Sequence, residues 1–89
     1  MSKAAEQWDA FAAEVRKHIE NYVVPQYGDI DTELAKDFDA KDCKRQAETY
    51  LARFGRSKRE GEAELDMLKT AHWVQKTWTK MGEANAENS

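Results

Sequence analysis

Apolar residues recur every three or four positions near the start of the chain, which is the spacing of one face of an α-helix. Charged residues occupy the positions between them. The apolar face of this predicted helix consists of Trp8, Phe11, Ala12, Val15, Ile19, Tyr22 and Val23. Because proline pushes the preceding residue out of helical geometry, we expect the helix to stop at Pro25.

Residues 25–38 connect this helix to the next and combine turn-forming with apolar residues. Gly28 and Asp29 indicate a turn. Four further residues are too apolar for a linker that is exposed to water: Tyr27, Ile30, Leu34 and Phe38. We therefore expect an irregular connector that packs on the domain, with one helical turn near residues 32–37. A connection of this length in a small domain often has a functional role.

A second helix is predicted to begin after Asp39, whose carboxylate can accept the free amide hydrogens of the first turn. Its apolar face is Cys43, Ala47, Tyr50, Leu51 and Phe54. A thiol on such a face is buried and inert. Gly55 can adopt the left-handed conformation that ends a helix at low cost.

A third helix is predicted from residue 58 to residue 81, because Ser57 and Glu60 have the spacing of a capping box and Gly82 follows. Its apolar face is Met67, Leu68, Ala71, Val74, Trp78 and Met81. The short link FGRS brings the second and third helices into an antiparallel hairpin. The expected fold is all-α: a single three-helix domain at 1–82, in which the first helix and its packed connector cover the apolar groove of the hairpin, and a polar disordered tail at 83–89.

Composition limits the classes of function. The chain has 89 residues and a net charge of −3, which argues against nucleic acid as a partner. It contains one cysteine and no apolar run long enough to span a membrane, so we expect a cytoplasmic protein without membrane contact. Residues 1–42 carry five basic and ten acidic residues, whereas residues 43–81 carry nine and five. The two halves can attract each other within the fold, or the basic half can bind an anionic partner.

Basic residues gather around the predicted turn, at Arg53, Arg56, Lys58 and Arg59. The last two fall at the start of the third helix, where the helix dipole disfavours cations. Two interpretations stay open. The acidic residues that follow, from Glu60 to Glu64, can pair with these cations, or the cations can bind a phosphate together with Lys69.

Trp73 lies away from the predicted apolar face of the third helix, beside Lys69, Lys76 and Lys80. An exposed tryptophan among lysines is typical of a contact surface, so Trp73, Lys76 and Lys80 are candidates for an interface with a protein partner or with a second copy of the chain. Two alternatives stay open: Trp73 packs on the first helix or the connector, surrounded by lysine stems, or it stacks on a nucleic-acid base.

No complete catalytic, cofactor or metal motif is present. His18 and His72 are single helical histidines without a set of ligands at metal spacing. The DIDTE stretch lacks the glycine and the last glutamate of a calcium loop, and no phosphate-loop motif occurs. We expect no catalytic residues, no metal and no cofactor.

The segment AETYLARFGRSKREGEAELDMLKTAHWVQKTW resembles a segment of short phage-encoded proteins, in which a KYLxRxGxK helix end precedes an EDLxKAxWYL helix. It covers about a third of the chain; Thr49 stands where those proteins have lysine. The resemblance implies phage or prophage origin, and one branch of the group is described as a nucleotide kinase. The leading hypothesis is a non-enzymatic interaction protein, and the alternative is a nucleotide-binding or phosphoryl-transfer protein that uses the basic residues of the turn.

Overall fold

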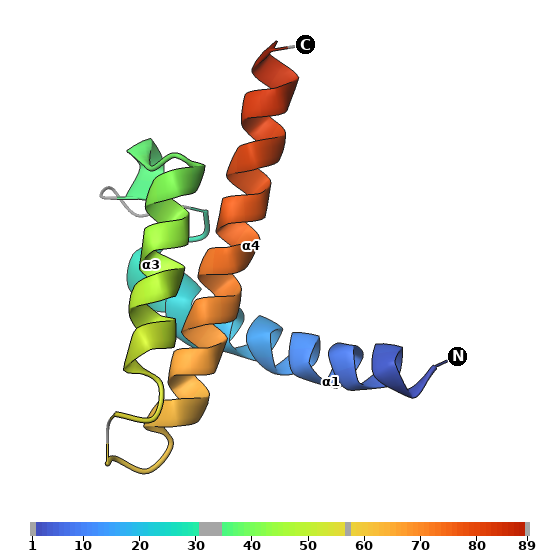
Figure 1. The fold of residues 1–89 in the computed structure, drawn as a ribbon, viewed down its shortest axis with the longest axis vertical. Helices are drawn as coiled ribbons and strands as arrows, with labels where there is room; N and C mark the ends of the chain where they lie inside the picture. Colours follow the sequence, from blue (N-terminus) through green and yellow to red (C-terminus); the bar gives the residue numbers. More distant parts are fainter. Residues whose placement is uncertain (1, 31–34, 57, 89) are drawn as a thin grey trace.

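The computed structural model describes residues 2–30, 35–56 and 58–88, with side chains described as far as residue 85. Within these ranges the chain is helical and contains no strand, so the all-α prediction is confirmed. Two long helices, α3 (Ala40–Arg53) and α4 (Glu62–Asn88), run side by side in opposite directions (Figure 1). The predicted antiparallel hairpin is therefore present.

The first helix does not stop at Pro25. Helix α1 (Lys3–His18) continues into a π-helical segment η1 (Ile19–Val23) and then into α2 (Val24–Tyr27). The Val24 amide donates to the carbonyl of Ile19, five residues back, so the helix widens just before the proline. A wider turn accommodates a residue that lacks an amide hydrogen, which explains why the prediction was wrong.

This helix ends instead at Gly28. Its φ is +102°, a value that residues with a side chain rarely adopt, and its amide donates to the carbonyl of Val24 at 3.0 Å. In the connector a 3₁₀ turn, η2 (Ala35–Asp37), agrees with the predicted helical turn near 32–37. Residues 32–34 of that prediction, Leu34 included, lie outside the described residues.

Asp39 caps α3 as predicted. Its Oδ1 accepts from the Asp42 amide at 2.9 Å, and Oδ2 of Asp42 accepts from the Asp39 amide at 3.1 Å. The two carboxylates thus satisfy amide groups that the first turn leaves free. At the other end of α3, Gly55 has the predicted left-handed backbone, with φ of +80°.

The boundaries predicted for the third helix are wrong at both ends. The link spans residues 54–61, and α4 begins at Glu62, immediately after Gly61, which also has a positive φ. Ser57 of the expected capping box lies outside the described residues. At the far end α4 continues through Gly82 to Asn88, because one glycine in an exposed helix costs only about 1 kcal/mol and the neighbouring residues favour helix.

The core is small. Among the described residues, the buried apolar side chains are Ala35, Cys43 and Ala47, and the buried polar ones are His18, Asp66 and His72. Cys43 is therefore buried, as expected. Helix α1 extends away from the hairpin and meets α4 near its own C-terminal end (Figure 1), so the expectation that the first helix covers the hairpin is wrong for most of its length.

Candidate functional site

An ion pair joins the end of α3 to the second turn of α4. Nη2 of Arg53 lies 2.7 Å from Oδ1 of Asp66 and 3.3 Å from Oε1 of Glu62. The side chain of Asp66 is only 1% exposed. Hydrogen bonding to Asp66 is the main cause that raises the pKa of Arg53 above its ordinary value. For Arg53, the geometry supports the interpretation that the basic residues pair within the fold.

Among the other basic residues of the predicted anion site, Lys69 shares the Tyr50 ring with Arg53, whose guanidinium carbon lies 5.3 Å from the ring centre. Arg56, Lys58 and Arg59 are exposed in the link before α4, so they do not sit in its first turn and the argument from the helix dipole does not apply to them. Lys69 lies on α4, where its Nζ is 5.2 Å from the centre of the Tyr50 ring. A single anion site made of all five cations stays a prediction.

Helix α4 is rotated relative to the prediction. Val74, Trp78 and Met81, which we expected to be buried, are exposed, and Trp78 is 72% exposed. Asp66 and Trp73 instead lie on the inner side, toward α3. Polar residues can occupy this side because hydroxyl groups bond to the helix itself: Thr70 donates to the Asp66 carbonyl at 2.7 Å, and Thr77 does so to the Trp73 carbonyl at 2.8 Å.

Trp73 is half-buried. Its ring centre lies 6.1 Å from that of Phe38, and Nζ of Lys76 lies 5.8 Å from it while donating to the carbonyl of Ile30 at 2.7 Å. This agrees with the alternative in which Trp73 packs on the connector among lysine stems. Lys80 is half-buried, one turn beyond Lys76. Whether a partner contacts Trp73, Lys76 or Lys80 stays a prediction.

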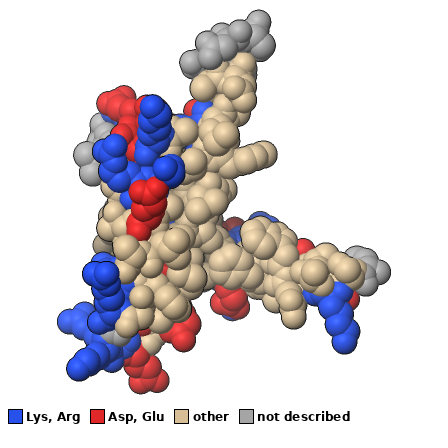
Figure 2. Space-filling model, viewed as in Figure 1, with Lys and Arg blue, Asp and Glu red and all other residues tan. Residues whose placement is uncertain are grey.

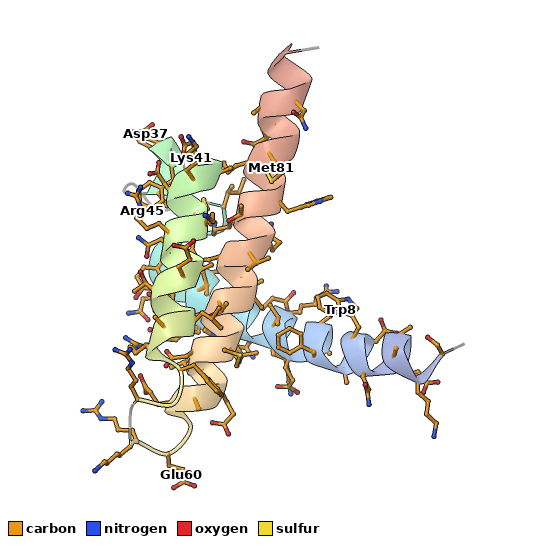
Figure 3. All side chains as sticks on the ribbon, in the orientation of Figure 1. Trp8, Asp37, Lys41, Arg45, Glu60 and Met81 are labelled. Atoms are coloured by element: carbon orange, nitrogen blue, oxygen red, sulfur yellow. The ribbon has the colours of Figure 1, made fainter. Side chains whose placement is uncertain are left out.

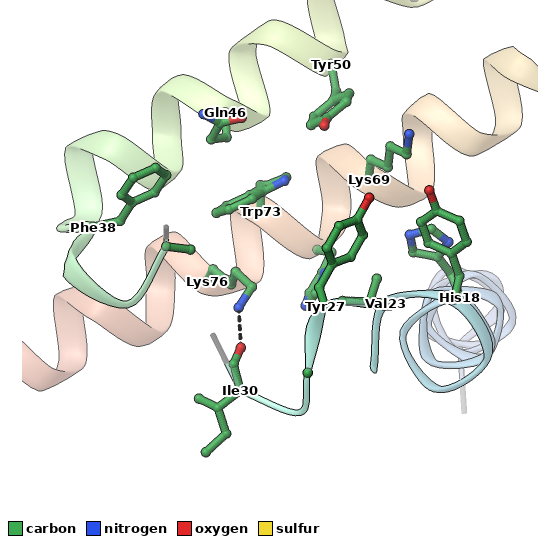
Figure 4. A pocket seen from close by; sticks show the side chains of 14 residues that line it. His18, Val23, Tyr27, Ile30, Phe38, Gln46, Tyr50, Lys69, Trp73 and Lys76 are labelled. Atoms are coloured by element: carbon green, nitrogen blue, oxygen red, sulfur yellow. Dashed lines mark hydrogen bonds between the residues drawn. The ribbon is translucent and has the colours of Figure 1, made fainter. Parts of the chain in front are cut away.

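These packing relationships leave a pocket of about 420 Å³ between α3, α4 and the segment that runs from η1 through α2 (Figure 4). Aromatic rings from four parts of the chain and two lysines dominate its lining. The full set is His18, Tyr22, Val23, Tyr27, Gly28, Ile30, Ala35, Phe38, Gln46, Tyr50, Lys69, His72, Trp73 and Lys76. Sequence reasoning found Trp73, Lys69 and Lys76 but not the tyrosines, which come together only because the first helix continues past Pro25.

Two side chains that line the pocket, His18 and Tyr27, have pKa values that depart from their ordinary values. Burial, and next the charge of Lys69, lower the pKa of His18, whose ring stacks on Tyr22 with the centres 5.3 Å apart. The pKa of Tyr27 is raised, mainly by hydrogen bonding with Tyr22. Both shifts favour the uncharged forms of His18 and Tyr27.

Large apolar side chains are exposed on α1 and α4, and also on α3, where Leu51 of the predicted apolar face is 56% exposed. Trp8 on α1 is 63% exposed and lies on the side that faces the C-terminal half of α4 (Figure 3). Phe11 packs against it, with the ring centres 5.7 Å apart. On α4 the exposed apolar residues are Val74, Trp78 and Met81. Figure 2 shows that charged side chains gather over α3 and the link, while the C-terminal half of α4 is mostly uncharged in this view.

Within the described ranges, no three metal-binding side chains of His, Cys, Asp or Glu are grouped closely enough to hold an ion. In the same ranges, no helix combines the length and the apolar character needed to cross a membrane. Comparisons with protein-family models, curated proteins and solved structures found no match to this chain.

Proposed function

We propose that this chain is a small non-enzymatic interaction protein that associates with a second copy of itself through α1 and the C-terminal half of α4. The observation that carries the proposal is the exposure of large apolar side chains on both helices, Trp8 and Trp78 above all. Contiguous apolar surface on a water-exposed helix is typical of an interface.

The exposed area of the chain supports a second copy as the partner that covers α1 and the C-terminal half of α4. A compact monomer of 10.3 kDa exposes about 5,400 Å², whereas this chain exposes 7084 Å². The excess is on the order of 1,700 Å², and a stable interface needs roughly 800 Å² from each partner. Each copy therefore has enough uncovered surface for an extensive interface.

The small core supports the same conclusion. Ala35, Cys43 and Ala47 are the buried apolar residues of the described chain, and each has a small side chain. Burying a large apolar side chain contributes about 1.5–3 kcal/mol to stability. A domain with so small a core therefore becomes more stable when a second copy covers its exposed aromatic residues. Small domains often reach stability by oligomerisation.

Light scattering during size-exclusion chromatography tests the proposal on the native chain and on two variants, Trp8→Glu and Trp78→Glu. We expect the native chain to be dimeric and each variant to shift toward monomer, because a charge would be buried without a partner. Gln7→Glu and Gln75→Glu are matched controls: each adds the same charge on the same helix at an exposed polar position.

A native chain that stays monomeric up to millimolar concentration would contradict self-association. Equal effects of the tryptophan and glutamine variants would contradict the assignment of the surface. Phage origin, which rests on the resemblance, and nucleotide binding or phosphoryl transfer, which rests on the resemblance and on the basic residues of the turn, stay predictions.

A further inference from the structure

We propose that the pocket between α3, α4 and the η1–α2 segment binds a small molecule that carries a planar aromatic ring and an anionic group, either a carboxylate or a phosphate. The proposal is independent of self-association, because it rests on the interior of one chain. Three features support it: an ammonium group that pairs with no carboxylate among the described residues, a lining rich in aromatic rings, and the size of the pocket.

Lys69 supplies the site for the anion. Its side chain is half-buried, and its Nζ lies 5.2 Å from the ring centre of Tyr50 and 6.0 Å from that of Tyr22. Within the described part of the chain, no carboxylate lies within ion-pair distance of it. Aromatic faces compensate only part of the lost hydration of an ammonium group. An anionic ligand would complete this environment through a charge-assisted hydrogen bond.

The charges around Lys69 agree with this assignment. None of the described residues that line the pocket is acidic, although the chain as a whole has a net charge of −3. The nearby Asp66 is not available, because it is buried against Arg53. The lysine also lowers the pKa of His18, so its field reaches into the pocket. The interior is therefore positive in a protein that is negative overall.

The aromatic lining defines the other half of the ligand. Figure 4 shows the labelled Tyr27, Phe38, Tyr50 and Trp73 around one space, with Lys69 among them. The ring of Trp73 is tilted by 35° against Phe38, and Tyr22 and Tyr27 meet edge to face. Such rings offer apolar faces for stacking and phenol groups for hydrogen bonds at the rim. A flat aromatic ring satisfies both, whereas a branched aliphatic chain does not.

The volume restricts the size of the ligand. At about 420 Å³ the pocket lies in the lower part of the range for small-molecule sites, roughly 300–1,000 Å³. It can therefore hold one ring system with a short anionic substituent. Binding of a folded macromolecule inside it is excluded by size.

Isothermal titration calorimetry of the full chain tests the proposal with two pairs of probes, each an anion and its neutral counterpart. Adenosine monophosphate against adenosine represents the phosphate source, and indole-3-acetate against indole-3-acetamide represents the carboxylate source. In at least one pair we expect the anion to bind about tenfold more tightly, the effect of one hydrogen bond to a charged group. The pair that shows the larger difference identifies the anionic group.

Variants then assign the anion contact. Lys69→Gln should abolish the preference for the anion, and Lys69→Arg should retain most of it because the charge remains. Lys44→Gln, an exposed lysine on α3 that pairs with Glu48, is the matched control and should bind like the native chain. Binding of the neutral probes by the Lys69→Gln variant, with the affinity of the native chain, shows that its site is folded.

Two results would overturn the proposal. One is the absence of binding by both anionic probes at millimolar concentration. The other is a Lys69→Gln variant that prefers the anions as strongly as the native chain does.

Discussion

The ion pair between Arg53 and Asp66 fixes the register of the two long helices. Nη2 of Arg53, the last residue of α3, lies 2.7 Å from Oδ1 of Asp66 in the second turn of α4. The same guanidinium lies 5.3 Å from the ring centre of Tyr50, so it also closes one end of the aromatic cluster. A pair of this kind fixes which turn of α3 faces which turn of α4, because one turn of slippage would leave the buried carboxylate without a cation.

The Asp66→Ala variant should lower the free energy of unfolding by about 1–3 kcal/mol, since a buried hydrogen-bonded group is lost. Urea denaturation followed by circular dichroism measures this change. Arg53→Met should also destabilise, because the carboxylate of Asp66 would stay buried without its partner. The exposed Arg56→Met variant is the control, and equal effects of the Arg53 and Arg56 variants would show that the ion pair contributes nothing.

Two glycine substitutions should act in opposite directions. Gly28 has a φ of +102°, so Gly28→Ala should destabilise by about 1–3 kcal/mol through backbone strain alone, as no atom crowds the new Cβ. Gly82 is helical with equally open surroundings, so Gly82→Ala should stabilise by about 0.5–1 kcal/mol. Thermal unfolding of both variants against the native chain checks the signs. Stabilisation by the Gly28 variant would contradict the helix end described above.

His18 should make stability depend on pH. Burial lowers its pKa in the folded state below the value in the unfolded state, so the unfolded chain binds the proton more tightly. The contribution of His18 is present above the unfolded-state pKa of about 6.5 and is lost as pH falls through that value toward the folded-state pKa. Urea unfolding of the native chain and of His18→Gln between neutral and mildly acidic pH should give a smaller pH slope for the variant.

The same residue reports on Lys69. Removing the lysine charge in Lys69→Gln should raise the pKa of His18 toward its ordinary value, because that charge is one of the two causes of the shift. A proton NMR titration of the imidazole measures the pKa directly. An unchanged pKa would mean that the ammonium group does not face the pocket in solution.

Self-association predicts that thermal stability depends on protein concentration. Binding between folded copies stabilises the folded state by mass action, so the midpoint of unfolding should rise as the chain is concentrated. Differential scanning calorimetry over a hundredfold range of concentration tests this. The Trp78→Glu variant should show a midpoint that is lower and independent of concentration, and a concentration-independent native midpoint would argue against a dimer.

Much of the fold follows from local sequence signals. Asp39 and Asp42 cap α3 through contacts between residues three positions apart, and Gly55 reverses the chain through its own backbone freedom. Such signals depend on few neighbours, so they can be read from the sequence. The helix ends predicted at Pro25 and Gly82 were wrong. The helix accommodates Pro25 through the wider turn that precedes it, and it continues through Gly82 because the residues on both sides favour helix.

The site was harder to predict because α4 does not bury its most apolar side. The inner side is set by Asp66, whose partner Arg53 is thirteen residues away, and by threonines that bond to their own helix. The periodicity of apolar residues predicts that these polar residues are exposed. The tyrosines of the pocket were missed for a related reason, since their approach to Lys69 depends on the path of the chain between Ile19 and Gly28.

The π-helical segment Ile19–Val23 has a consequence for how the protein tolerates changes in length. A π-turn contains one residue more than an α-turn, and one residue corresponds to about 100° of helical rotation. Deleting one residue within this segment would convert its wide turn into an α-turn, so the rotation across it would stay at about one full turn and Trp8 and Phe11 would keep nearly the same azimuth relative to Tyr27. A deletion in α1 after Phe11 would instead rotate both residues by about 100°. The segment can therefore absorb a one-residue change of length that the regular helix before it cannot.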